Sequence, residues 1–159
     1  MVVYVMKLRP ELLLDPILPL DLHGLNPRTL IPSWWNKERK KVYEKYNYCC
    51  AACGKLCNQK GALHAHELYK YKNKVAKLKE VVALCKDCHN FLHTGRLNCL
   101  LHEGSITANE HKRILNHGFA ILEKANLSEK FEDKFKLKDG NSDGWCMIID
   151  GVKHKKTLH

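Results

Sequence analysis

Two segments in the middle of the chain alternate apolar and polar residues in the way that strands do. The first is ALHAHELYKY over residues 62–71, and the second is LKEVVALC over residues 78–85. A short, basic connector separates them. A period of two places alternate side chains on opposite faces of a strand, so the pattern predicts a β-hairpin.

Helical periodicity appears on both sides of this hairpin. Ser33 is a candidate N-cap for a helix over about 34–47, whose apolar stripe is formed by Trp35, Val42, Tyr43 and Tyr46. Directly after the second strand, the pattern predicts a short helix from Asp87 to about His93, ended by Thr94 and Gly95. A capping box at 107–110 opens a further helix to about residue 125, with one face made of Ile114, Leu115, Ile121 and Leu122.

The two ends of the chain have a different character. All five prolines lie within the first 32 residues, which we therefore predict to be an extended arm. Its apolar residues need cover from the domain surface or from a partner, for which a second copy of the chain is one candidate. Residues 33–127 then form the folded domain, and 128–159 a charged extension whose apolar segment WCMII either pairs with the domain or stays peripheral. The fold class expected is α+β.

Length and hydropathy restrict the class of protein. A chain of 159 residues with 45% hydrophobic residues is sufficient for one compact domain with arms. No run of 18 apolar residues exists, which argues against a transmembrane helix. The apolar N-terminus is interrupted by prolines and acidic residues, unlike the core of a signal peptide. We therefore predict a cytoplasmic protein without membrane association.

The formal charge of +10 favours a polyanionic partner, of which nucleic acid is the commonest. The helix predicted over 34–47 interleaves aromatic residues with a basic surface that suits contact with phosphates. An ordinary solvated helix face explains the same charges equally well. The candidate nucleic-acid-binding residues are Lys37, Arg39, Lys40, Lys41 and Lys45.

Eight cysteines in a cytoplasmic chain indicate metal binding before disulfides. Two Cys-x-x-Cys pairs, each able to chelate one ion, together supply four thiolates for a tetrahedral zinc ion. The four predicted ligands of this structural zinc are Cys50, Cys53, Cys85 and Cys88. Cys49 and Cys57 compete with Cys50 and Cys53 for the first pair, but a Cys-x-x-Cys-Gly turn can aim backbone N–H groups at sulfur.

Histidines of the short helix suggest a second metal ion. His89 and His93 are four residues apart and project from one helix face, a spacing at which two imidazoles can bind an ion. The alternative is that His89 caps the helix and His93 is a surface residue near the helix C-terminus, where positive charge is favourable.

These motifs together resemble those of the HNH, or ββα-metal, nuclease superfamily. The resemblance rests on Cys-x-x-Cys-Gly, a strand with histidine, and LC-x-x-CH-x-x-x-H, and extends over roughly residues 26–125. The segments NPRTLIPSWW, YCCAACG and CHNFLHTGRL are similar to those of phage and bacterial HNH-like proteins. The subgroup most similar has two zinc knuckles and a His-Glu pair on the first strand.

The resemblance implies a ββα-metal core in which His89 and His93 hold a divalent ion and His66 is the general base. His64 or Glu67 would orient His66 or complete the metal shell. A register shifted by one residue makes His66 the ligand and Glu67 the base instead. Ala65 stands where the family often has a further ligand, and Glu80 where it has its asparagine.

The function expected is therefore an endonuclease that hydrolyses phosphodiester bonds in DNA, with RNA as the alternative substrate. Its cofactors would be a structural Zn²⁺ and a catalytic divalent cation such as Mg²⁺ or Mn²⁺. The alternative is a non-catalytic zinc module of the same fold that binds nucleic acid or a protein. Ala65 and Glu80 favour this alternative, because they remove groups that the nuclease likeness expects.

Overall fold

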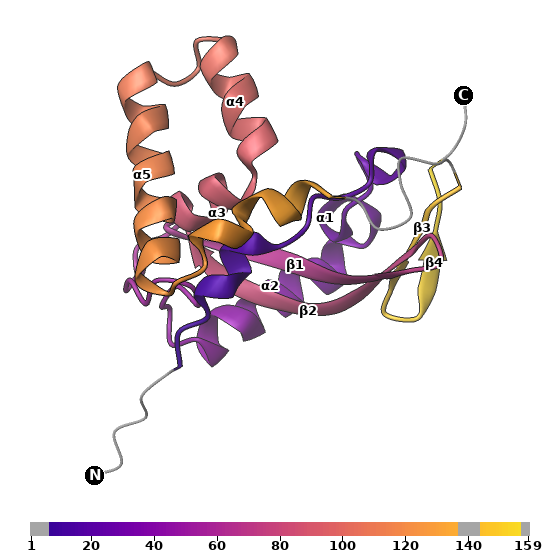
Figure 1. Ribbon diagram of the computed structural model, residues 1–159. Coiled ribbons are helices and arrows are strands. Elements are labelled where there is room, and N and C mark those ends of the chain that lie inside the picture. The colour runs from indigo at the N-terminus through magenta and orange to yellow at the C-terminus, as the bar shows by residue number, and fades with distance from the viewer. Residues whose placement is uncertain (1–6, 137–143, 157–159) are drawn as a thin grey trace.

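The protein is an α+β structure with one four-stranded sheet and surrounding helices, which confirms the predicted class (Figure 1). The computed structural model describes residues 7–136 and 144–156. Strand order in the sheet follows the order in the chain. The strands are β1 (Leu63–Lys72), β2 (Val75–Cys85), β3 (Cys146–Ile149) and β4 (Val152–His154).

The β1–β2 hairpin is the longest feature of the sheet and lies where the alternating pattern predicted it. Its two-residue turn has positive φ at both Asn73 (50°) and Lys74 (58°). A turn of this kind matches the twist of antiparallel strands and so fixes their register. The register pairs Leu63 with Cys85, which brings the start of β1 beside the end of β2.

Helices surround the hairpin, and most agree with the predicted ones. In Figure 1, α3, α4 and α5 lie at one end of the hairpin and β3–β4 at the other. The N-cap of α5 is the expected one, since Thr107 accepts a hydrogen bond from the N–H of Glu110. The predicted helices correspond to α2 (Pro32–Lys45), α3 (Lys86–Leu92) and α5 (Ala108–Lys124).

Helix α4 (Thr94–His102) was not predicted, because Gly95 looked like a helix terminator. The chain does leave helical geometry at His93 (φ −87°, ψ 58°) between α3 and α4. Gly95, however, has no positive φ and belongs to the first turn of α4. The chain thus turns at His93 and then begins a new helix, α4. No helix in the described part of the chain is long and apolar enough to cross a membrane.

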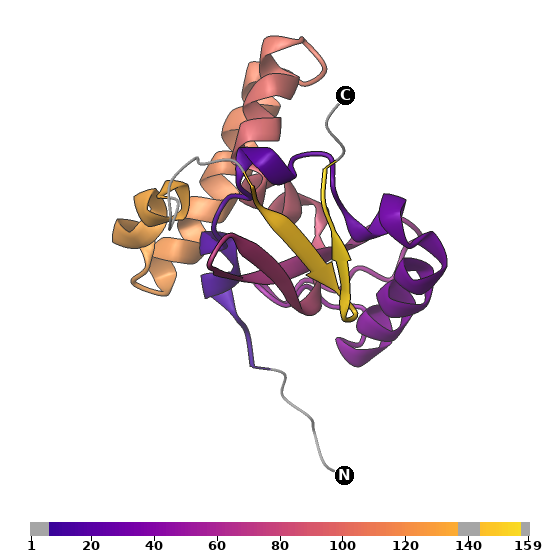
Figure 2. The same ribbon diagram turned by 90° about the vertical axis from the view of Figure 1, so that its right-hand side faces the viewer.

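The prediction of an extended N-terminal arm is wrong for residues 7–32. This segment forms two 3-10 helices and one α-helix, and Figure 2 shows it lying against the rest of the molecule. The first six residues of the predicted arm lie outside the described ones. The elements are η1 (Pro10–Leu14), η2 (Leu20–Leu22) and α1 (Pro27–Leu30).

The prolines start these short helices instead of preventing them. Pro10 and Pro27 occupy first-turn positions, where the missing N–H is not needed and the fixed φ suits a helix. Leu12 and Leu13 are buried in the main core, and Leu22 in a second one. The chain itself therefore covers these leucines; a homodimer or protein partner bound through the segment stays a prediction.

The predicted C-terminal extension, 128–159, contributes to the fold wherever it is described; its residues 137–143 and 157–159 lie outside the described ones. The WCMII segment does pair with the domain, because β3 adds to β2 in parallel. Trp145, Met147 and Ile149 form the second core with Leu22. The N- and C-terminal segments thus stabilise each other at the end of the sheet far from α3.

Helix η3 (Ser128–Phe135) anchors the same extension at the other end. The ammonium of Lys134 is buried and donates to the Leu92 carbonyl at 2.7 Å, at the C-terminus of α3. It lies 5.6–5.9 Å from the ring centroids of Phe91, Phe131 and Phe135, and burial lowers its pKa to about 8. A positive charge at this position interacts favourably with the free carbonyls at the C-terminal end of α3.

A close contact between α3 and α5 yields a stability prediction. A Cβ added at Gly118 would lie 2.1 Å from the Phe91 ring, which is fully buried. We expect Gly118→Ala to lower the free energy of unfolding by about 1–3 kcal/mol through overpacking. Urea unfolding followed by circular dichroism measures this.

The control is Gly95→Ala, also in a helix but with open space around the added methyl. It should be neutral or raise the free energy of unfolding by up to about 1 kcal/mol, because alanine is the better helix former. An unchanged unfolding midpoint in Gly118→Ala would contradict the packing described.

Candidate functional site

Four cysteines converge where the first knuckle meets the junction of β2 and α3. The sulfurs of Cys50, Cys53, Cys85 and Cys88 all lie within 4.8 Å of one another. Cys53 Sγ and Cys85 Sγ are 3.8 Å apart. A tetrahedron with Zn–S distances of about 2.3 Å has edges of roughly 3.8 Å, so the cluster has the size that a tetrathiolate ion needs. The cluster could hold a metal ion such as zinc.

Backbone hydrogen bonds shape both knuckles. In the first, the Gly54 N–H donates to the Cys50 carbonyl and the Cys50 N–H to the Lys55 carbonyl, both at 2.9 Å, which closes a tight turn. Gly54 has φ 81°, a conformation that favours glycine. In the second, the Cys88 N–H donates to Cys85 Sγ at 3.4 Å. A donor of this kind stabilises a thiolate.

The close approach of the four sulfurs shifts the pKa values of the thiols in opposite directions. Hydrogen bonds from Cys53 lower the pKa of Cys50, and donation to Cys50 raises the pKa of Cys88. Four thiolates so close together therefore require a cation between them. His117 of α5 adds a contact that sequence reasoning missed, with Nε2 3.3 Å from Cys88 Sγ.

The remaining cysteines stay outside this group. Cys49 and Cys57, the competing candidates for the first pair, contact the carbonyls of Asn47 and Lys55 at 3.5 Å each. All eight cysteines have free thiols.

A second group of possible ligands consists of histidines from β1 and α3. Nitrogens of His66, His89 and His93 lie within 4.8 Å of one another. His89 Nε2 and His93 Nε2 are 3.0 Å apart, close to the spacing of roughly 3.4 Å for two nitrogens on one tetrahedral zinc ion. The structure thus brings together the two histidines predicted as ligands and the one predicted as base.

His64 extends the group toward the start of β1. Its Nδ1 lies 3.0 Å from His89 Nδ1. Burial lowers the pKa of His89 to about 2 and that of His93 to about 4, and it also lowers the pKa of His64. These imidazoles are therefore neutral at physiological pH, the form in which histidine binds a metal ion.

Asp15 of the N-terminal segment completes the surroundings of His66. Its Oδ2 lies 3.0 Å from His66 Nε2, and both side chains are largely buried. His66 Nδ1 is buried and has no hydrogen-bond partner among the described residues. A carboxylate that holds one imidazole nitrogen leaves the other free for an ion, which is the usual arrangement around ligand histidines. Sequence reasoning missed Asp15 because the segment carrying it was predicted to be extended.

Glu80 on β2 has a structural partner. It accepts from Arg9 Nη2 at 2.6 Å and Nη1 at 3.3 Å, and Arg9 also donates to the Tyr46 hydroxyl. The guanidinium lowers the pKa of Glu80. This pair joins the segment before η1 to β2, and η1 leads directly to Asp15. Glu80 thus helps to place the carboxylate that contacts His66.

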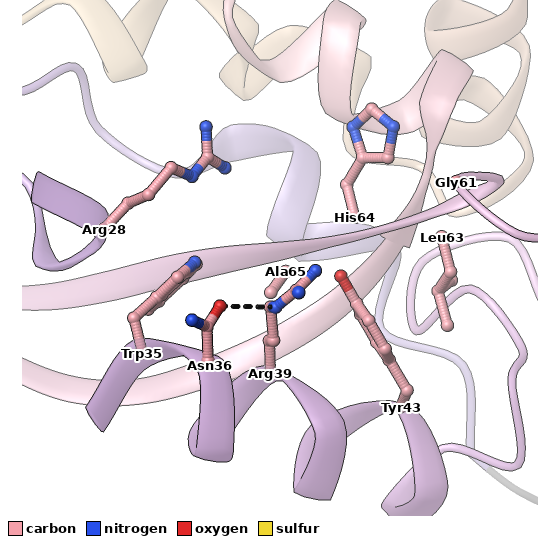
Figure 3. Close-up of a pocket in the computed structure, with 9 residues that line it drawn as sticks. All are labelled: Arg28, Trp35, Asn36, Arg39, Tyr43, Gly61, Leu63, His64 and Ala65. Carbon is pink, nitrogen blue, oxygen red and sulfur yellow. Dashed lines mark hydrogen bonds between the residues drawn. The ribbon is translucent and has the colours of Figure 1, made fainter. Parts of the chain in front are cut away.

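A basic pocket of about 390 Å³ is lined by His64 (Figure 3). Arg28 from α1, Arg39 and Tyr43 from α2, and His64 from β1 point toward it. Arg39 Nε donates to Asn36 Oδ1 at 3.1 Å, whereas Arg28 has no hydrogen-bond or ion-pair partner among the described residues. Two guanidinium groups around one hollow suit a phosphate.

Of the basic residues predicted to contact nucleic acid, only Arg39 lines this pocket. The other four are exposed on α2: Lys41 pairs with Glu38 at 3.5 Å, and Lys45 lies 5.8 Å from the Tyr46 ring centroid. The remaining two are Lys37 and Lys40. Arg28 was missed because it belongs to the predicted arm.

No family model, curated protein or solved structure matches this chain. The chemistry available therefore follows from the side chains alone. It consists of a tetrathiolate cluster, a separate histidine group with its own carboxylate, and a basic pocket beside that group.

The cysteine cluster yields a prediction on metal content. We expect about one zinc per chain in the purified wild type, and loss of that zinc with partial unfolding in Cys50→Ser. Plasma mass spectrometry and circular dichroism measure the two effects. Cys49→Ser is the matched control, since its sulfur lies outside the cluster and its zinc content should be unchanged. Equal zinc loss in both variants would contradict the ligand set.

The contact between Asp15 and His66 yields a second prediction. Asp15→Asn should weaken binding of a divalent ion at the histidine group about 10–100-fold, because a neutral amide is a weaker acceptor than the carboxylate and orients His66 less firmly. Titration with Mn²⁺, followed by electron paramagnetic resonance, gives the affinity. Glu11→Gln removes the same charge from the same segment and should have little effect. If both variants weaken binding equally, the contact has no specific role.

Proposed function

We propose that this protein is a metal-dependent nuclease of the HNH type that hydrolyses phosphodiester bonds in nucleic acid. The observation that carries the proposal is the group of His66, His89 and His93, which is separate from the cysteine cluster and in which burial keeps His89 and His93 neutral. A structural zinc needs only the four thiolates. Three further ligand nitrogens and a supporting carboxylate have no role in that zinc site.

The arrangement of the elements supports the proposal as well. The resemblance to HNH nucleases implies a β-hairpin followed directly by a helix that carries two histidines, with a third histidine on the first strand. Here His89 lies on α3, His93 is its C-cap, and His66 lies on β1. Cys85 and Cys88 lie at the start of the same helix. A structural zinc at the cysteines would therefore fix the position of His89 and His93.

The catalytic ion, such as Mg²⁺ or Mn²⁺, would be held by His66, His89 and His93. His66 is then a metal ligand, as in the register shifted by one residue. When bound, such an ion stabilises the negative charge that develops on the phosphate during hydrolysis. Asp15 keeps His66 Nε2 engaged, so that Nδ1 is available. Arg28 and Arg39 bind an adjacent phosphate of the strand and orient it.

Glu67 is then the general base. It follows His66 directly and lines the same cleft as His66 and His93. Its carboxylate accepts the proton of the attacking water, which is a role that contributes about 10²–10⁴-fold to a rate. In the other assignment, His66 itself is the base.

The proposal is tested by nicking of a supercoiled plasmid with Mg²⁺ or Mn²⁺. Wild type should cleave, while His89→Ala should lose both cleavage and ion binding at the histidine group. Glu67→Gln should bind the ion normally and cleave about 10²–10⁴-fold more slowly. His102→Ala, an exposed histidine at the end of α4, is the control and should resemble wild type.

His66→Ala separates the two assignments. Loss of ion binding makes His66 a ligand, whereas retained ion binding with lost cleavage makes it the base. A wild type that retards DNA but never cleaves would overturn the nuclease proposal. It would favour the non-catalytic zinc module, for which the engagement of Glu80 by Arg9 is the supporting observation.

A further inference from the structure

A larger cleft, of about 910 Å³, adjoins the histidine group. The segment around residues 15–26 lines it together with β1 and the start of α4. His66 and His93 belong to its lining, so the cleft is continuous with the candidate ion site. Its volume is in the range of pockets that enclose a small organic group.

The walls of this cleft differ from those of the basic pocket. Tyr69 and Tyr71 line it with their rings 6.3 Å apart and tilted by 48°. Burial raises the pKa of both tyrosines, so their hydroxyls stay protonated. The Tyr69 hydroxyl is buried and lacks a hydrogen-bond partner in the part of the chain that the structure describes. An unpaired buried hydroxyl is costly unless a ligand or water bonds to it.

Charge determines what the cleft can accept. Glu67 and Asp15 both line it, and their carboxylates repel a phosphate. The same carboxylates accept hydrogen bonds from N–H groups, which nucleobases carry on their edges. Arg96 also lines the cleft, near its His93 wall. The cleft therefore suits a flat, neutral group with N–H donors that is attached to a phosphate near the histidines.

We propose that this cleft binds an unpaired nucleobase of the strand that is cut, next to the scissile phosphate. Tyr69 and Tyr71 contact its faces or edge, and Glu67 or the Tyr69 hydroxyl bonds to its polar atoms. The proposal rests on the nuclease function above and specifies its substrate as single-stranded or locally opened nucleic acid. A base within a duplex enters such a cleft only after leaving the stack, which costs a few kcal/mol.

The test measures binding apart from cleavage. Zinc-loaded wild-type protein, with no other divalent cation added, is titrated into two fluorescent probes. One is a single-stranded oligonucleotide, and the other is a hairpin whose duplex stem contains that same sequence. Fluorescence anisotropy gives both affinities, and a denaturing gel checks that the probes stay intact. We expect the single strand to bind at least about tenfold more tightly, since stacking of one base on aromatic side chains is worth about 1–3 kcal/mol.

Tyr69→Leu and Tyr48→Leu form the matched pair of variants. Tyr69→Leu should weaken single-strand binding roughly 5–150-fold while leaving duplex binding unchanged. Tyr48 is an exposed tyrosine outside both pockets, and Tyr48→Leu should leave both affinities unchanged. Tyr69→Phe keeps the ring and removes only the hydroxyl, so it should retain most of the affinity.

Equal affinity of wild type for single strand and duplex would overturn the proposal. So would a Tyr69→Leu variant that is folded by circular dichroism and binds the single strand as wild type does. These outcomes are distinct from failure of the nuclease proposal, which is absence of cleavage when Mg²⁺ or Mn²⁺ is added.

Discussion

The convergence of four sulfurs in a sphere of a few ångströms is the constraint on which the rest of the structure depends. The four cysteines come from a turn before β1 and from the junction of β2 and α3. Bringing them together fixes the turn against the hairpin and fixes the start of α3. The cysteine cluster thereby also fixes the position of His89, which follows Cys88 directly in the chain.

A second set of contacts acts from the opposite side. Arg9 binds Glu80 on β2, η1 packs over α3 and α5, and Asp15 then reaches His66. The histidine group is thus enclosed by a segment far from it in the chain, whose Asp15 lies 51 residues before His66. Burial keeps the imidazoles of His89 and His93 neutral, and the carboxylate of Asp15 orients that of His66. A site of this kind suits an ion better than a solvent-exposed pair of histidines would.

Sequence alone was informative where local pattern decides structure. The alternation in β1 and β2, the capping box of α5 and the spacing of the cysteines each specify their own element. Tertiary contacts decided the rest. The prolines near Leu12 and Leu22 start short helices because the leucines are buried in a core. Gly95 lies in the first turn of a new helix, α4, because Leu97 of that helix is buried in the main core. Asp15 and Arg28 could not be assigned to the site while their segment was predicted to be extended.

The central claim is that the chain holds two separate metal ions, one among cysteines and one among histidines. Anomalous diffraction from a crystal soaked in Mn²⁺, with data at the zinc and manganese absorption edges, tests it most directly. The account predicts a zinc peak between Cys50, Cys53, Cys85 and Cys88, and a manganese peak between His66, His89 and His93. A map with a zinc peak at the cysteines but no peak at the histidines would contradict it.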